Sequence, residues 1–165
     1  MTAHRRRIFL LFSTVALSLL TQVAIAGANV PMSGSDDGTF TVPGPCANGD
    51  LNVVITGEGT ATHLGRYSYH ASECFNPVAG TFVGEPTFIA ANGDELWGTY
   101  SGSVGGTSDP AVITYSESLI VSGGTGRFVG ATGELQVDGL ADLATGDYSQ
   151  TLSGWISNLG LTRGP

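Results

Sequence analysis

The sequence predicts an all-β protein that folds as a single eight-stranded antiparallel β-barrel. No stretch keeps the 3.6-residue apolar period of a helix for more than two turns. Short alternating runs are instead separated by turn signals such as Asn48-Gly49 and Asn92-Gly93, a residue pair that favours two-residue hairpins. A domain of this length would expose long edges if its strands formed an open sheet, and closing the sheet removes those edges. We therefore expect a closed barrel whose interior holds side chains or one small ligand.

The first 26 residues have the three parts of a secretory signal peptide. Arg5–Arg7 form a basic start, Ile8–Leu20 is an apolar run, and Ala24–Ala26 has the small-x-small pattern of a cleavage site. A membrane anchor is the alternative, but the run is shorter than the roughly 20 residues that a spanning helix needs. We expect a cleaved signal peptide over residues 1–26, a secreted or periplasmic protein, and no membrane span in the mature chain. The arginines leave both the general secretory and the twin-arginine export routes open.

A polar, glycine-rich stretch precedes the expected barrel. We expect a flexible N-terminal segment over residues 27–37 and a barrel domain over residues 38–165. The first strand is expected at Thr39–Val42, because threonine, phenylalanine and valine favour strands. Pro43 follows it, and proline cannot donate a hydrogen bond to a strand ladder.

The next three strands follow from alternation and turns. Leu51–Thr62 places leucine, valine and isoleucine on one face, and Arg66–Phe75 returns with aromatic residues at alternate positions. The segment His63–Gly65 between them has the composition of a hairpin tip. Thr81–Ala90 is expected as the fourth strand, after an Asn-Pro turn.

The remaining four strands complete the barrel. Glu95–Val104 follows the second Asn-Gly turn, and Val112–Val121 follows a loop that ends in Asp-Pro. Ala131–Leu140 and Asp147–Ser157 come after a glycine-rich segment and close the set. Hairpin connections throughout predict a meander, in which each strand pairs with the next one along the chain.

The chain after residue 26 is strongly acidic. It has three arginines and no lysine against 14 aspartates and glutamates, and the formal charge of the whole sequence is −8. Nucleic acids and anionic lipids are bound by neutralising their phosphates, so we expect no nucleic acid as a partner. Solubility is the simple interpretation of this charge, and binding of cationic partners or Ca²⁺ is the alternative.

Two cysteines, Cys46 and Cys74, are expected to form one disulfide if the protein is exported. Free thiols and a metal-binding pair are the alternatives. Zinc would need further ligands, and neither His63 nor His70 is spaced to supply them. We therefore expect no metal site and no cofactor.

The segment Ser122–Glu134 is the most glycine-rich part of the chain. In it, Gly123, Gly124 and Gly126 are expected to form a tight structural turn, since glycine takes backbone angles that other residues avoid. Phe128 is expected to plug one end of the barrel, and Arg127 to pair there with a carboxylate or a carbonyl group. A phosphate-binding loop is excluded because no Gly-Lys-Ser/Thr ending follows.

These glycines also carry a resemblance to a known family. The run Gly123-Gly124-Thr125-Gly126-Arg127-Phe128 resembles a segment of dirigent proteins and allene oxide cyclases, and Thr62–Arg66 resembles a hairpin of dirigent proteins. The whole also looks like small secreted bacterial proteins with that barrel. The resemblance implies an allene oxide cyclase-like barrel with an apolar cavity, often as a homotrimer. It also implies cyclisation of a fatty-acid epoxide or steering of radical coupling, and the active-site residues of neither activity can be placed on this chain.

Glu117 is the strongest single candidate for a catalytic or ligand-anchoring residue. It shares a strand face with Tyr115 and Leu119, and that face is otherwise apolar. If this face points inward, Glu117 is a desolvated carboxyl group that could act as a general acid or base, or anchor a ligand. The alternatives are that the strand faces outward, or that Arg66 or Arg127 neutralises the carboxylate.

Aromatic residues on the expected strands could line a cavity for a small apolar ligand. The candidates for ligand contact, besides Glu117, are Tyr67, Trp97, Tyr100 and Tyr115. The leading hypothesis is an exported, non-catalytic barrel that binds a small apolar or amphipathic molecule. An isomerase or cyclase-like enzyme that uses Glu117 and a structural scaffold without a ligand are the other two.

Overall fold

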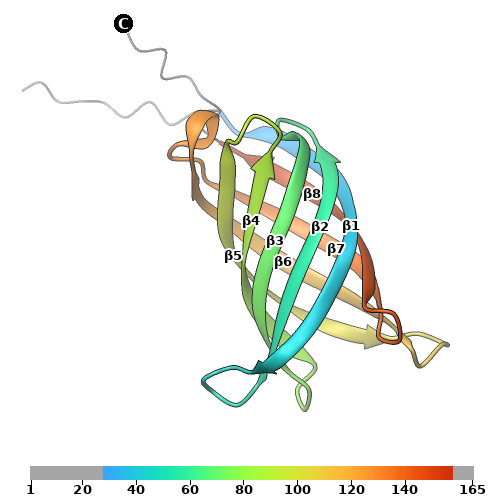
Figure 1. Ribbon diagram of the computed structural model, residues 1–165. Coiled ribbons are helices and arrows are strands. Elements are labelled where there is room, and N and C mark those ends of the chain that lie inside the picture. The colour runs from blue at the N-terminus through green and yellow to red at the C-terminus, as the bar shows by residue number, and fades with distance from the viewer. Residues whose placement is uncertain (1–27, 158–165) are drawn as a thin grey trace, which may run out of the picture.

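The computed structural model describes residues 28–157 as one closed antiparallel barrel of eight strands, which confirms the predicted fold class (Figure 1). The strands pair in chain order, and β1 pairs with β8 to close the sheet. The elements are β1 (Val30–Pro45), β2 (Leu51–Ala61), β3 (Gly65–Asn76), β4 (Thr81–Ala90), β5 (Glu95–Gly106), β6 (Val112–Gly124), the 3₁₀-helix η1 (Gly126–Phe128), β7 (Gly133–Asp142) and β8 (Asp147–Ile156).

The predicted signal peptide, residues 1–26, lies outside the described residues. Within residues 28–157, no helix has the length and hydropathy needed to cross a membrane.

The first strand corrects the sequence prediction. Residues 30–37 are not a flexible segment but the first half of β1, which pairs with β8 on one side and β2 on the other. Met32 and Asp36 are buried at alternate positions, while serines and threonines occupy the outward positions. The inward glycines Gly34 and Gly38 lie so close to β2 that an added Cβ would meet its backbone. The polar composition of this stretch therefore reflects a solvated outer face and close strand packing.

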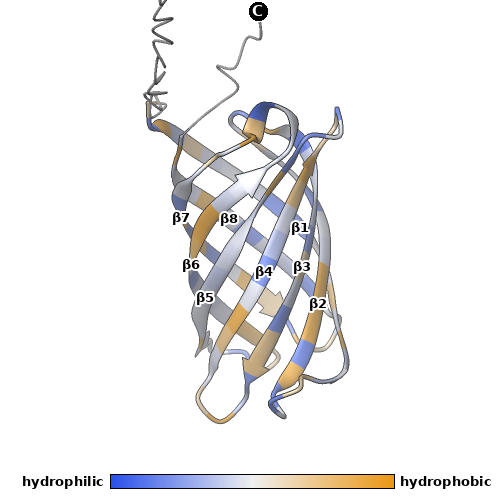
Figure 2. Ribbon diagram, turned by 90° about the vertical axis from the view of Figure 1, so that its left-hand side faces the viewer, coloured by the Kyte–Doolittle hydropathy of each residue, from blue (hydrophilic) through white to orange (hydrophobic). Residues whose placement is uncertain are grey.

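The two ends of the barrel differ. Phe128 of η1 and Leu64 of the β2–β3 turn are buried together with Leu96, Ala131 and Ile156, and they fill one end of the barrel. This is the end at which β1 begins and β8 finishes (Figure 1). Figure 2 shows polar and apolar residues alternating along the strands, as expected for a sheet that turns one face inward. The opposite end carries the β1–β2, β3–β4, β5–β6 and β7–β8 connections and is less tightly filled.

The glycine-rich turn is built differently from the prediction. Of the three glycines expected to form the turn, only Gly126 has a positive φ (55°), whereas Gly123 and Gly124 continue β6 and pair with β5. A Cβ on Gly123 would meet the Trp97 indole, and one on Gly124 would meet Phe128, so close packing requires glycine at both positions. Arg127 donates a hydrogen bond to the carbonyl of Leu64 (3.0 Å), and its guanidinium lies 3.7 Å from the Asp94 carboxylate.

The predicted disulfide is confirmed. Cys46 lies just after β1 and Cys74 lies near the end of β3, with a Cα–Cα distance of 6.0 Å. The bond ties the β1–β2 connection to the barrel wall at the end opposite η1.

Candidate functional site

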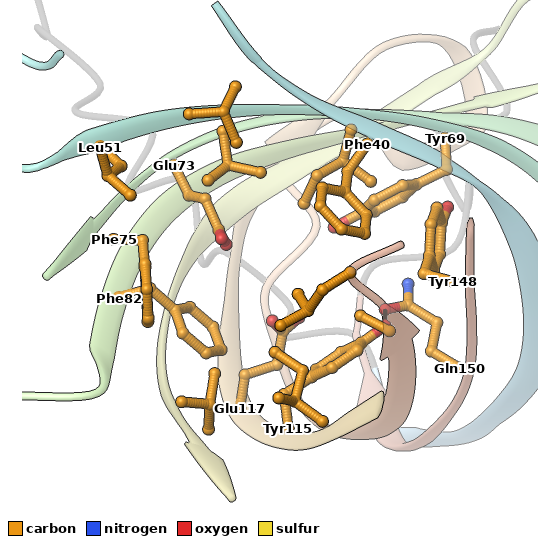
Figure 3. A pocket seen from close by; sticks show the side chains of 17 residues that line it. Phe40, Leu51, Tyr69, Glu73, Phe75, Phe82, Tyr115, Glu117, Tyr148 and Gln150 are labelled. Carbon is orange, nitrogen blue, oxygen red and sulfur yellow. Dashed lines mark hydrogen bonds between the residues drawn. The ribbon is translucent and has the colours of Figure 1, made fainter. Parts of the chain in front are cut away.

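A cavity of about 300 Å³ occupies the half of the barrel away from η1. Its wall is almost entirely apolar, and every strand contributes to it (Figure 3). Its rim is formed by Val42, Leu51 and Leu143, residues that are 49%, 38% and 53% exposed. The cavity is therefore open to solvent at one end and closed by packed side chains at the other. The aromatic wall residues are Phe40, Tyr69, Phe75, Phe82, Tyr115 and Tyr148.

Asp36 organises a hydrogen-bond network deep in the barrel. Its carboxylate accepts hydrogen bonds from the hydroxyls of Tyr67 (2.7 Å) and Tyr148 (2.9 Å) and from the amide of Gln150 (3.1 Å). The Tyr115 hydroxyl donates in turn to the Gln150 amide oxygen (2.9 Å). Burial raises the pKa of Asp36, and the three donated hydrogen bonds oppose this shift because they favour the charged form.

Glu73 is a second lumen carboxyl group, on β3. Its carboxyl group accepts a hydrogen bond from the Tyr100 hydroxyl at 2.9 Å. Burial raises the pKa of Glu73 to about 7, and the hydrogen bond from Tyr100 limits the rise. Glu73 and Tyr100 also line a depression on the outer wall, where Glu85 of β4 takes no part in the pairing with β5.

Glu117 is a third carboxyl group, and it lies on β6 with its side chain at the cavity (Figure 3). The residue is 5% exposed, and its Oε1 has no hydrogen-bond partner among the described residues. Burial raises the pKa of Glu117 to about 8, and the negative charges of Glu73 and Asp36 add to the rise. At neutral pH this carboxyl group is therefore mostly protonated.

Inward glycines set the positions of the tyrosine rings. Gly84 faces Tyr100 across the β4–β5 pair, and Gly139 faces Tyr115 across the β6–β7 pair. An added Cβ at either glycine would overlap the facing ring. The tips of both rings thus lie against the neighbouring strand, and from this position the Tyr100 hydroxyl donates its hydrogen bond to Glu73.

The predicted ligand-contact residues separate into three groups. Tyr115 and Glu117 line the cavity, as expected for an inward face of β6. Tyr67 and Tyr100 are buried inside the barrel but do not line this cavity. The expectation for Trp97 is wrong: the residue is 36% exposed on the outer face. Trp97 and Tyr100 are three positions apart, so a regular strand turns them to opposite faces.

Sequence reasoning missed Asp36 and Glu73. Glu73 lies two residues from both Ala71 and Phe75, which are on the inward face. The two-residue period of the strand could therefore have predicted that Glu73 also points inward. Asp36 lay within the stretch that was expected to be flexible. Among the described residues, no three His, Cys, Asp or Glu side chains lie close enough together to hold a metal ion.

The stability of the protein is expected to fall as pH rises from about 5 to about 8. In the unfolded chain, the carboxyl groups of Glu73 and Glu117 are ionised by about pH 5. In the folded protein, burial raises their pKa values to about 7 and about 8, so they stay protonated to higher pH. Rising pH in this window therefore favours the unfolded state, by at most about 1.4 kcal/mol per pH unit for each group.

Urea unfolding at several pH values measures this slope. The Glu117→Gln variant is expected to reduce it, while Glu134→Gln, at an exposed position of β7, should leave it unchanged. Equal slopes for wild type and Glu117→Gln would show that Glu117 is not a desolvated carboxyl group.

Comparisons with known proteins support the fold. No protein-family model matches the sequence, and no curated protein matches it. Among solved structures, the pterocarpan synthase dirigent protein PsPTS1 superposes with a TM-score of 0.59 at 13% identity, covering 79% of this chain and 96% of that one. The pterocarpan synthase dirigent protein GePTS1 gives a TM-score of 0.58 at 12% identity, covering 89% of this chain and 97% of that one. The chain therefore has the dirigent-like eight-stranded barrel fold.

Proposed function

We propose that this protein binds a small apolar or amphipathic molecule inside its barrel. The observation that carries the proposal is the open cavity of about 300 Å³ with an almost wholly apolar wall. That volume is at the lower end of the range for small-molecule sites, which are mostly apolar with a few convergent polar groups. Here the polar groups are Glu73, Glu117 and Gln150.

A pair of leucine substitutions tests the proposal. Leu143 lies on the cavity rim and Leu140 on the outer face of β7, and both are about half exposed. Leu143→Asp is expected to weaken binding of 1-octanol about tenfold, because the rim loses the apolar side chain that covers a ligand. Isothermal titration calorimetry measures the affinity, and Leu140→Asp should change it less than about twofold. Equal effects of the two substitutions would place binding outside the lumen.

A second candidate function is supported by the position of Glu117. An isomerase or cyclase-like enzyme needs an acid or base that faces its substrate, and Glu117 lines the cavity with a pKa raised to about 8. Such a group would donate a proton near neutral pH. Turnover that Glu117→Gln abolishes while ligand affinity is retained would favour this function over binding alone.

Export of the protein is part of the proposal. The disulfide between Cys46 and Cys74 supports an oxidising compartment, in agreement with the signal peptide expected from the sequence. N-terminal sequencing of protein recovered from its own source tests this, and a mature chain that begins near Gly27 is the expected result.

A further inference from the structure

We propose that the lumen selects apolar molecules that carry a protonated amine, with the ammonium group beside Glu117 and the apolar part against the aromatic wall. This inference rests on the proposed function, because it names the chemical class of the ligand. Four features of the described residues support it.

The first feature is an unpartnered acceptor. Glu117 is 5% exposed, its Oε1 has no hydrogen-bond partner within residues 28–157, and its side chain lines the cavity. A buried polar atom without a partner is costly, and native proteins rarely retain one without a reason. An ammonium group donates three hydrogen bonds and accepts none, so it would satisfy this oxygen.

The second feature is the sign of the charge around Glu117. The titratable groups that face it are Asp36 on β1, Glu73 and Tyr69 on β3, Tyr100 on β5 and Tyr115 on β6. Tyr148 on β8 lines the same cavity. All of them are acids. The inward positions of β2, β4 and β7 are occupied by apolar residues and glycine.

The basic residues of the described chain lie elsewhere. Arg66 is 82% exposed, Arg127 belongs to the closed end, and His63 and His70 are exposed. No basic side chain of residues 28–157 lines the cavity. A ligand carboxylate would therefore meet like charge without a partner, whereas a cation would meet opposite charge in a poorly solvated site.

The third feature is the aromatic wall. Three phenylalanines and three tyrosines line the cavity, and Phe82 and Tyr115 pack edge to face with ring centroids 6.5 Å apart. The faces of aromatic rings attract cations, most strongly where water is excluded. Aromatic rings next to carboxylates form a site that is suited to an organic cation.

The fourth feature is the protonation state of the lumen. Glu117 is mostly protonated at neutral pH because burial raises its pKa to about 8. An ammonium ligand would stabilise the carboxylate, so binding near pH 7 would release a proton from Glu117 to solvent. Binding of a neutral alcohol would release none.

A matched ligand series tests the inference. Octylamine, 1-octanol and octanoate share the apolar chain and differ in the head group. Calorimetry at pH 8.5 is expected to show octylamine binding at least about tenfold more tightly than 1-octanol, and octanoate more weakly than both. At pH 7, titrations in two buffers of different ionisation enthalpy should show release of up to one proton for each octylamine bound.

The Glu117→Gln variant completes the test. It is expected to lose most of the preference for octylamine over 1-octanol and to abolish the proton release. A wild-type protein that binds octylamine no more tightly than 1-octanol would overturn the inference and leave the proposed function intact. A lumen that binds none of the three molecules would overturn both.

Discussion

Replacing Asp36 by alanine is expected to lower the free energy of unfolding by about 3–5 kcal/mol. The substitution removes the acceptor of three hydrogen bonds and leaves the Tyr67 hydroxyl, the Tyr148 hydroxyl and the Gln150 amide without a partner inside the barrel. Each buried donor that loses its acceptor costs about 1–3 kcal/mol. Because the network joins β1, β3 and β8, its loss weakens the closure of the barrel.

Asp37 provides the matched control. It is the next residue of β1, carries the same side chain and is exposed on the outer face. Denaturant unfolding of Asp37→Ala is expected to show a change below about 0.5 kcal/mol, as for most surface substitutions. A similar effect of both substitutions would mean that net charge, and not the internal network, accounts for the loss of stability.

Removal of the disulfide is expected to have the second large effect. The bond joins Cys46 to Cys74 across a sequence separation of 28 residues. Loss of such a loop constraint lowers the free energy of unfolding by about 3–4 kcal/mol on the chain-entropy estimate. The double variant Cys46→Ser, Cys74→Ser should therefore unfold at clearly lower denaturant concentration than the wild type.

Reduction of the wild-type protein supplies the control, because the sequence contains no other cysteine. Protein treated with dithiothreitol should match the double serine variant within about 0.5 kcal/mol, with two thiols detected by chemical titration. Unchanged stability after complete reduction would show that the β1–β2 connection is held by other contacts.

Alternation along the strands was enough to predict the fold and two of the residues with polar groups that line the cavity. The two-residue period placed Tyr115 and Glu117 on the inward face of β6, and the structure has both at the cavity. The same period places Glu73 on the inward face of β3, but a charged residue interrupts the aromatic pattern of that strand, so the sequence analysis did not name it. By the same period, Trp97 and Tyr100 lie on opposite faces of β5, so they could not both point into the barrel.

Other features depend on contacts between distant parts of the chain. The first half of β1 is a strand because β8 lies beside it, with Val30 opposite Ile156, and a local pattern of serine, aspartate and glycine does not show this pairing. Asp36 is buried for the same reason. The cavity itself depends on how rings stack over glycines of neighbouring strands, as Tyr100 does over Gly84, and such stacking needs the register of the whole barrel.

Nuclear magnetic resonance of the protein with bound 1-octanol would locate the ligand directly. We expect intermolecular contacts from the octyl chain to the methyl groups of Val53, Ile55 and Ala141, which line the cavity. Contacts confined to Val83 and Ile120, exposed on the outer face, would contradict ligand binding inside the barrel.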